Sequence, residues 1–418
     1  MEKYTSLKSK YFYDKTPDKK EYNSFLISRL TNELTIFSGL KMNPFDSKKE
    51  CRLKNEYEIF FMPTLEISLI KEEIFKNSQI ISEKMTNLPS VAADQLFFNT
   101  LIFELQSTND IEGVHSSRQE LSEVINNVIT KSSGPNMRFE GLVQQYLNLR
   151  KQKFNSIKNI DEFRKIWDIL VGNEEKDDVP DGLLFRTEPE SIYDDHDRLI
   201  HVGDFTEEQI TQNLNHLIKE MNDSSIPSLE KCFIAHYYYE YIHPFYDGNG
   251  RTGRYIACSY LARKLDIMTA VSFSYAISFD KNRYYKPFMD MSKFYNHGDA
   301  TMFILEMLKI LLNGQERFIG RINDGINLLE LANDTIKELD VKDNEKAILY
   351  ILFQKHIFGD YAPELTDNAI REVLNISSYK MRNHTSTLEK KGLIKIVKEK
   401  PKVHILADIL LNDIEPLR

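Results

Sequence analysis

The sequence predicts a mainly α-helical protein with one small β-hairpin and a C-terminal winged helix-turn-helix. Three observations support this fold class. Glycine and proline are sparse, at 16 and 13 of 418 residues. Apolar residues recur at the three- and four-residue spacing of a helix along much of the chain. The C-terminal end, over residues 343–418, instead combines short helical stretches with two strand-like runs.

Composition excludes several classes of protein. The chain has 54 basic and 63 acidic residues, and its net charge of −9 argues against a protein that coats nucleic acid or anionic membranes throughout its length. No apolar run approaches the ~18 residues that cross a bilayer, and the first fifteen residues hold no signal-peptide stretch. Three cysteines are too few for a disulfide framework or a CxxC zinc site. We therefore expect a cytoplasmic protein without a membrane partner.

The helical pattern is clearest in the middle of the chain. Residues 1–90 carry no readable motif and are expected to be a mostly helical N-terminal region. Residues 91–107 then predict a largely buried helix, because apolar residues occur on all of its faces. Five further segments show the helical period: residues 139–154, 206–222, 228–242, 252–265 and 299–313. Between them, Leu184–Val202 mixes extended residues with the turn Asp194-Asp195-His196-Asp197 and predicts a hairpin.

The C-terminal region is organised differently. Residues 316–342 are expected to form a helical connector. Three helices are expected after it, near residues 343–356, 366–374 and 378–390. Two alternating runs, Leu393–Val397 and Lys402–Leu406, follow with Pro401 at the bend. Three helices and a hairpin predict a winged helix-turn-helix over 343–418.

This region also carries its own charge. Residues 379–404 contain eight basic and two acidic residues, a net charge of +6, which leaves −15 for the rest of the chain. In a winged helix, 378–390 would be the recognition helix, and both it and the lysine-rich hairpin can meet phosphates. Lys380, Arg382 and Asn383 are the candidate residues for contacts with bases or phosphates. Two kinds of partner therefore stay open for this region. One is DNA, bound at 378–404, and the other is a protein, which includes a second copy of the chain in a homodimer.

One loop concentrates the residue types that carry chemistry. It spans residues 243–254, reads HPFYDGNGRTGR and joins two expected helices. Gly248 and Gly250 let backbone N–H groups converge, and the positive end of the next helix, which we expect to open at Thr252 or a neighbour, completes an anion site. Arg251 and Arg254 can share one face of its first turn. Two guanidinium groups indicate an oligophosphate rather than a single carboxylate.

Two other side chains of this loop suit phosphate chemistry. The Asp247 carboxylate is the kind of oxygen ligand that Mg²⁺ takes when it bridges phosphates. His243 can accept a proton from an attacking hydroxyl near pH 7. The alternatives are a connector that binds nothing and a degenerate site that binds nucleotide without reacting. The combination of two glycines, two arginines, a histidine and an acid favours the reactive site.

The loop resembles the signature of the Fic (filamentation induced by cAMP) family, HxFx(D/E)GNGRxxR, at every specified position. The similarity continues to about residue 312, where Tyr284-Tyr285 look like the adenine-side tyrosines and Gly298-Asp299-Ala300-Thr301 looks like the start of the closing helix. The resemblance implies a Fic-type helical core over 91–315 with a small β-hairpin flap.

The resemblance also implies roles for these residues. The activity would be transfer of AMP from ATP to a Ser, Thr or Tyr hydroxyl of a target protein or of the chain itself, with His243 as general base and Asp247 holding Mg²⁺. The implied nucleotide contacts are Phe245 as an apolar anchor, Gly248, Asn249 and Gly250 at the α- and β-phosphates, Arg251 and Arg254 at the β- and γ-phosphates, and Tyr284 and Tyr285 at adenine. The hairpin near 184–203 would be the flap on which the target pairs as an added strand. Relatives with near-identical loops use other nucleotides or phosphocholine, or remove AMP, so the transferred group stays open.

A second motif lies upstream of the loop. Thr108-Asn109-Asp110-Ile111-Glu112-Gly113 resembles the inhibitory (S/T)xxxE(G/N) motif of autoinhibited Fic proteins, here at the end of a helix expected at about 94–113. The resemblance implies that Thr108, Glu112 and Gly113 form a brake, with the Glu112 carboxylate paired to Arg254 in the place of the γ-phosphate. The plainer alternative is a helix C-terminus capped by Gly113.

The sequence allows two other interpretations, a metal site near His236 and a regulatory function for the whole chain. His236 and Glu240 stand four residues apart on one helix, a spacing that suits two metal ligands, with His201 or His243 as a third. A packed, hydrogen-bonded His236 is the favoured interpretation, because no zincin signature surrounds it. For the whole chain, the rival to an enzyme is a DNA-binding transcriptional regulator whose Fic core senses nucleotide or modifies itself.

Overall fold

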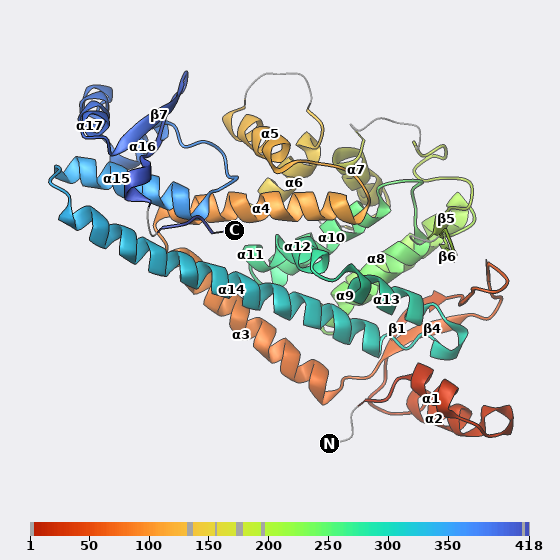
Figure 1. Ribbon diagram of the computed structural model, residues 1–418. Coiled ribbons are helices and arrows are strands. Elements are labelled where there is room, and N and C mark those ends of the chain that lie inside the picture. The colour runs from red at the N-terminus through yellow and green to blue at the C-terminus, as the bar shows by residue number, and fades with distance from the viewer. Residues whose placement is uncertain are drawn as a thin grey trace.

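The structure is a computed structural model that describes residues 4–131, 137–154, 157–172, 179–193, 197–411 and 414–417. It is mainly helical, which confirms the predicted fold class (Figure 1). The α-helices are α1 (Leu7–Tyr13), α2 (Lys20–Leu30), α3 (Leu65–Asn87), α4 (Ser90–Ile111), α5 (Arg118–Thr130), α6 (Glu140–Arg150), α7 (Asp161–Leu170), α8 (Glu207–Met221), α9 (Ser228–Ile242), α10 (Asn249–Lys264), α11 (Ile267–Ala270), α12 (Phe273–Ser278), α13 (Lys281–Met291), α14 (Thr301–Glu338), α15 (Asp343–Phe358), α16 (Asp367–Leu374) and α17 (Ser378–Lys390).

The strands form four separate antiparallel pairs: β1 (Ile36–Met42) with β4 (Tyr57–Phe61), β2 (Phe45–Asp46) with β3 (Cys51–Arg52), β5 (Ser191–Tyr193) with β6 (Leu199–Val202), and β7 (Ile394–Glu399) with β8 (Lys402–Leu406). Three short 3₁₀ helices complete the chain: η1 (Pro17–Lys19), η2 (Phe294–Asn296) and η3 (Asp408–Leu410). Among the described residues, no helix is long and apolar enough to cross a membrane.

Helix α4 runs through the centre of the molecule. Its residues are buried on nearly every face, as expected for a helix that is apolar all round. It packs against α5 and α6 on one side and α10 and α12 on the other, and α15 covers its N-terminal half (Figure 1). The helix runs to Ile111, four residues past the predicted 91–107 segment, so its C-terminus carries the predicted inhibitory motif.

The predicted hairpin is present as β5 and β6, where Ser191 pairs with Val202 and Ile192 with His201. The register shifts between Ile192 and Tyr193, which pairs with Leu199. Residues 194–196 of the expected turn lie outside the described residues. We call residues 184–203 the flap.

The N-terminal region holds strands as well as the helices that we expected. β1 and β4 pair across fourteen intervening residues, and Phe60 of β4 bridges to Asp299 just before α14. The buried Arg29 donates from Nη1 to Asp299 Oδ2 over 2.8 Å. Helix α2 and this sheet are therefore fixed to the start of α14, a tie between distant segments that no local pattern signals.

The C-terminal elements lie close to their predicted places. α15, α16, α17, β7 and β8 fall within a few residues of the expected helices and runs. The expected connector at 316–342 differs, because α14 continues unbroken from Thr301 to Glu338 and contains the predicted boundary at 315/316. The region also contacts the centre of the fold, since the buried Gln354 side chain of α15 accepts a 3.0 Å hydrogen bond from the Ala92 backbone N–H of α4.

Candidate active site

The site is built around the N-terminus of α10. Gly248 caps this helix with a φ of +79°, and a Cβ there would lie 2.6 Å from Val171 Cγ2, so only glycine fits. The helix begins at Asn249, earlier than the predicted start at Thr252. The backbone N–H groups of Asn249, Gly250 and Arg251 therefore belong to the first turn, where N–H groups have no partner within the helix. The structure thus has a helix N-terminus at the place where the loop predicts an anion site, and the binding of an anion there stays a prediction.

The loop before α10 is held by a side-chain brace. Asn249 Oδ1 accepts from the Phe245 backbone N–H over 3.0 Å, and Asn249 Nδ2 donates to the Phe245 carbonyl over 2.7 Å. The Phe245 ring is fully buried and stacks on Trp167, with centroids 4.9 Å apart. Trp167 Nε1 also donates to the Asp247 carbonyl over 2.8 Å. Asn249 thus shapes the loop in this structure, and its contact with a phosphate stays a prediction.

Replacing Phe245 by alanine is expected to destabilise the fold by about 3–5 kcal/mol, the usual cost of removing a buried aromatic ring. The stacked Trp167 would lose its partner and the loop its anchor. The free energy of unfolding from denaturant titration measures the change. Phe245→Leu refills most of the volume and should cost less. A loss below about 1 kcal/mol for the alanine variant would contradict the anchoring role.

Arg254 lies buried on the first turns of α10 and is fixed from two sides. Its Nη1 donates to Glu112 Oε1 over 2.8 Å. Its Nε donates to Thr108 Oγ1 and its Nη2 to the Thr108 carbonyl, each over 3.0 Å. Burial alone would lower the pKa of Arg254, but the Glu112 carboxylate, with smaller contributions from Tyr284, Tyr285 and Glu240, raises it overall, so the guanidinium stays charged. The structure therefore brings together the three residues that the motif comparison linked.

The Glu112 carboxylate also covers the predicted anion site. A Cβ on Gly250 would lie only 2.2 Å from Glu112 Oε1, so this carboxylate oxygen sits directly against the first turn of α10. Gly113 follows with a φ of +72°, which turns the chain out of α4. Glu112 thus occupies the space and the charge that an anion would take at this helix N-terminus.

Helix α13 fastens the same end of α4. The Tyr285 hydroxyl donates to the Ile111 carbonyl over 3.1 Å, and Lys281 Nζ donates to the Asp110 carbonyl over 2.7 Å. These are C-terminal carbonyls of α4 that lack partners within the helix. Tyr285, predicted as an adenine contact, therefore touches the segment that carries Glu112.

His243 ends α9 with a φ of +54° and a ψ of +65°, the left-handed conformation that a histidine seldom adopts. Its side chain is half-buried. Burial lowers the pKa of His243 to about 3, with a further lowering by the Arg186 guanidinium and a partial offset from the Glu240 backbone. The imidazole is therefore neutral at pH 7 and has a lone pair for a proton.

Asp247 lies at the open side of the loop. Its side chain is 52% exposed, and its Oδ2 accepts from Arg251 Nη2 over 3.3 Å. Among the described residues, no cluster of three or more potential ligands could hold a metal ion on its own. A single accessible carboxylate nonetheless fits Mg²⁺, which binds through one or two carboxylates together with substrate phosphates.

Residues 157–261 match the model of the Fic/DOC family. The chain contains a Fic/DOC family domain. The matched segment includes the flap, α8, α9 and the whole loop of residues 243–254.

Three solved structures align with parts of the chain. A Fic family protein from Desulfovibrio desulfuricans G20 aligns with a TM-score of 0.51 at 17% sequence identity, covering 82% of this chain and 97% of that chain. A Fic domain containing signaling protein from Bacteroides thetaiotaomicron VPI-5482 gives 0.43 at 15% identity, covering 62% and 95%. Fic-1 from C. elegans gives 0.40 at 20% identity, covering 62% and 74%. The first of these supports a shared helical fold that extends beyond the matched Fic/DOC segment.

The Fic/DOC domain buries His236 rather than using it as a metal ligand. His236 Nε2 and the Tyr284 hydroxyl lie 2.7 Å apart in a buried hydrogen bond, which confirms the packed interpretation. Burial lowers the pKa of His236 to about 3. Glu240 is also enclosed, and burial together with the nearby Glu112 charge raises its pKa to about 8. Glu240 is therefore mostly protonated and neutral at pH 7.

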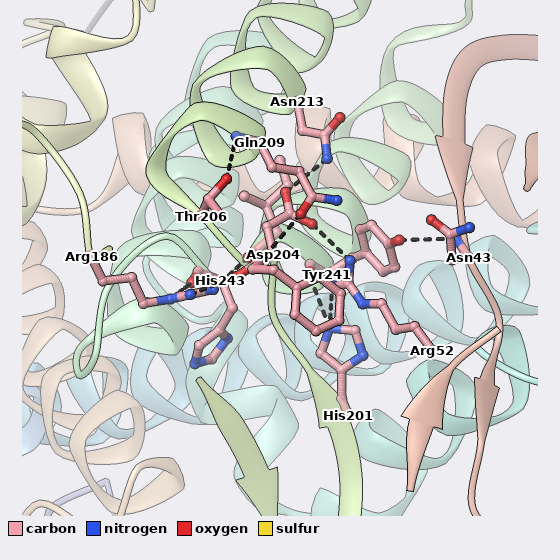
Figure 2. Close-up of polar contacts among 12 residues, drawn as sticks. Asn43, Arg52, Arg186, His201, Asp204, Thr206, Gln209, Asn213, Tyr241 and His243 are labelled. Atoms are coloured by element: carbon pink, nitrogen blue, oxygen red, sulfur yellow. Dashed lines mark hydrogen bonds and ion pairs between the residues drawn. The ribbon is translucent and has the colours of Figure 1, made fainter. Parts of the chain in front are cut away.

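The sequence missed a second buried cluster in the domain. Arg186, Asp204 and Arg52 lie behind His243 and connect the flap to α9 and β3 (Figure 2). They are separated by up to 191 positions from the loop they support. Arg186 lies in the predicted hairpin, where a charged side chain is expected to face solvent, and Arg52 lies in residues 1–90, for which no motif was recognised. Only the tertiary contacts identify them.

Proposed function

We propose that the Fic/DOC domain transfers AMP from ATP to a Ser, Thr or Tyr hydroxyl of a target protein or of the chain itself. One observation carries this proposal. A neutral histidine, His243, lies five residues before Gly248, the N-cap of α10, and this helix N-terminus is backed by the buried side chains of Arg251 and Arg254. That combination suits an attack on a polyphosphate better than hydrolysis of an uncharged substrate.

The reaction then follows from the residues present. His243 accepts the proton of the target hydroxyl while the hydroxyl oxygen bonds to the α-phosphorus. The bond from that phosphorus to the bridging oxygen breaks, and pyrophosphate leaves. Mg²⁺, held by Asp247 and the phosphates, would neutralise charge on the leaving group. Bound phosphates raise the pKa of His243 toward the range of an effective base, because a nearby anion favours the protonated form.

The flap supplies a place for the target. β5 and β6 form a two-stranded sheet within the described part of the chain, so each strand keeps one edge for an added strand. The end of β6 lies next to the buried cluster of Arg186, Asp204 and Arg52 behind His243. An extended target segment paired to this edge would lie next to the general base.

Glu112 restrains the enzyme in this proposal. Its carboxylate holds Arg254 and covers the first turn of α10, so a γ-phosphate competes with it for the same guanidinium. ATP that binds beside Glu112 would have its α-phosphate displaced from in-line attack.

The decisive experiment uses ATP labelled at either the α- or the γ-phosphate. Wild type and Glu112→Gly are incubated with Mg²⁺ and a cell lysate, and the proteins are separated on a denaturing gel. Label from the α-position alone supports AMP transfer. Label from the γ-position would mean phosphoryl transfer and would overturn the proposal. No label from either position would leave nucleotide sensing as the function.

A second candidate function, DNA binding, is favoured by the exposed face of α17. Tyr379, 69% exposed, stands there beside the exposed Lys380, Arg382 and Asn383. The hairpin contributes less than its charge suggests. Three of its lysines form ion pairs, Lys395 with Asp408, Lys398 with Glu364 and Lys402 with Glu389. Duplex contact would therefore concentrate on α17.

For this candidate, the double variant Lys380→Ala/Arg382→Ala should weaken duplex binding and lower the salt slope by about 2, one for each lost phosphate contact. Fluorescence anisotropy with a labelled random duplex at several salt concentrations measures both quantities. Lys395→Ala is the matched control, because that lysine is already paired with Asp408. Wild type that fails to bind duplex at low salt would exclude DNA as the partner.

A further inference from the structure

Arg186 is a buried cation whose hydrogen bonds, among the described residues, all go to backbone carbonyls. Its side chain has 0% exposure. Nε donates to the His243 carbonyl over 2.8 Å, Nη2 to the Ile242 carbonyl over 3.2 Å, and Nη1 to the carbonyls of Asp204 and Glu188. Burial lowers the pKa of Arg186 to about 10, with the Asp204 and Glu190 charges opposing the effect, so the group still carries its charge at pH 7. A buried cation is costly, and it persists only where its contacts matter.

Two of these carbonyls belong to the C-terminus of α9. The last carbonyls of a helix have no partner within it, and they carry the negative end of the helix dipole. The Arg186 guanidinium donates hydrogen bonds to the Ile242 and His243 carbonyls, and it also places a positive charge at the negative end of the helix dipole. Arg186 therefore acts as a side-chain cap on the helix that delivers the general base.

His243 needs such a cap because its backbone is strained. A left-handed conformation is unfavourable for a residue with a Cβ, and it persists where surrounding contacts fix it. The space around it is full: a Cβ on Gly203 would lie 2.3 Å from Arg186 Nη2 and 3.0 Å from His243 Cβ. The end of the flap is thus packed directly on both residues.

A second layer fixes Arg186 from behind (Figure 2). Asp204, whose carbonyl accepts from Arg186, donates its own backbone N–H to the Ile242 carbonyl over 2.9 Å. Its carboxylate accepts from Arg52 Nη1 and from Asn213 Nδ2, each over 2.7 Å. The flap, α8, α9 and the N-terminal strand β3 therefore meet at this one point.

The charged groups around His243 come from each neighbouring segment. Arg186 precedes the flap strands, Arg52 lies on β3 and His201 on β6, while the Glu240 backbone of α9 opposes them. His201 itself is neutral, because burial and Arg52 lower its pKa well below the usual value. The two arginines are the cations that disfavour a positive charge on His243.

We propose that Arg186 is a positioning residue for the transfer reaction: it holds the His243 backbone at the end of α9 and joins it to the flap. The inference rests on the proposed function for its effect on rate. Its geometric part, the fixing of His243 by the guanidinium, stands independently of the transferred group. Arg186 touches no reacting atom in this scheme.

The test uses Arg186→Lys and Arg186→Met in the Glu112→Gly background, which is expected to be active. Lysine keeps the charge but cannot span several carbonyls, whereas methionine removes both. We expect kcat to fall about a hundredfold in both variants, the effect of an approximately 1 Å displacement of a reacting group, with KM for ATP nearly unchanged. Arg29→Met is the matched control: it removes another buried arginine, which is paired with Asp299, and should lower stability without lowering kcat.

A second readout does not depend on activity. Nuclear magnetic resonance titration of ¹³C-labelled histidine follows the His243 imidazole in wild type and in each variant. Loss of the Arg186 charge should raise the pKa of His243 in Arg186→Met and leave it nearer to wild type in Arg186→Lys, so the acid limb of the rate profile moves to higher pH only in the methionine variant.

The outcomes separate the two proposals. Unchanged kcat and an unchanged His243 titration in both Arg186 variants would overturn the positioning role. If the parent enzyme labels nothing, the proposed function fails, and the titration together with the His243 resonance line shape still decides whether Arg186 fixes this residue. An equal loss of kcat in Arg29→Met would reduce the effect to general destabilisation and would also overturn the proposal.

Discussion

Glu112→Gly is expected to raise AMP transfer by about ten- to a hundredfold. The variant removes a charged hydrogen bond to Arg254, an interaction worth about 1.5–3 kcal/mol, and each 1.4 kcal/mol corresponds to a factor of ten in occupancy. Arg254 should keep its place, because Thr108 still accepts two of its N–H groups. A freed guanidinium over an open helix N-terminus is then available to the γ-phosphate.

Two variants separate this release from a simple loosening of α4. Asp110→Gly places the same flexible residue near the same helix end, at an exposed position, and retains the Glu112 carboxylate; it should remain restrained. Glu112→Gln keeps the shape but loses the charge, and it should fall between wild type and Glu112→Gly. The rate of α-label incorporation per enzyme measures all four proteins. Equal rates in wild type and Glu112→Gly would sink the idea of a brake.

The structure shows contacts of α13 with the segment of the proposed brake that the sequence did not signal. Lys281 and Tyr285 of α13 bond the carbonyls at the end of α4. Tyr284, beside them, bonds His236 on α9. Because the resemblance places these tyrosines at the adenine, a bound nucleotide would act on the same helix that fastens Glu112. Nucleotide binding and the proposed brake would then compete for the same residues of α13.

Elements of the fold were predictable from the sequence where neighbouring residues have strong conformational preferences of their own. Helix α17 has the predicted bounds because Asn375 takes a left-handed conformation with a φ of +49° and the Ser377 side chain caps the Lys380 N–H, both preferences of those residue types. The turn before α10 was predictable for the same reason, since Gly248 takes the left-handed conformation that glycine favours, with a φ of +79°.

What could not be predicted depends on contacts across the chain. Arg186 reaches the His243 carbonyl across 57 positions, and Arg29 reaches Asp299 across 270. Neither arginine differs in its local sequence from an exposed one, because burial of a charge is decided by tertiary packing. The start of α10 was missed by three residues because Asn249 braces Phe245 from within the helix, whereas asparagine usually favours the flanking cap.

Contact between the C-terminal region and the brake links the two candidate functions. α15 packs on α4, where Gln354 bonds the Ala92 N–H and the Asn99 side chain accepts from the Tyr361 N–H over 3.3 Å. The helix that carries Glu112 at one end is therefore contacted by the α17-bearing region near the other. If Glu112 acts as proposed, a partner on α17 that shifts α15 would act directly on α4, the helix that ends beside Glu112.

His243→Ala, made in the Glu112→Gly background, is expected to lower AMP transfer by about 10²–10⁴-fold, the usual contribution of a general base. ATP binding should persist, because the first turn of α10 and both arginines remain. The fold should be preserved as well, since alanine tolerates the end of a helix and Arg186 bonds the backbone carbonyl rather than the imidazole. A loss confined to kcat identifies a residue that acts in the transition state.

The measurement pairs α-label incorporation with a direct ATP-binding titration on the same preparations. His216→Ala is the control, because His216 is exposed on α8, and its rate should equal that of the parent. Transfer by His243→Ala at the parental rate would remove the imidazole from the mechanism, and the proton would then have to leave by way of water or phosphate. Loss of ATP binding together with activity would instead make His243 a residue that shapes the loop. Only a selective loss of kcat is consistent with a neutral imidazole placed by the end of α9 to take the proton from the target hydroxyl.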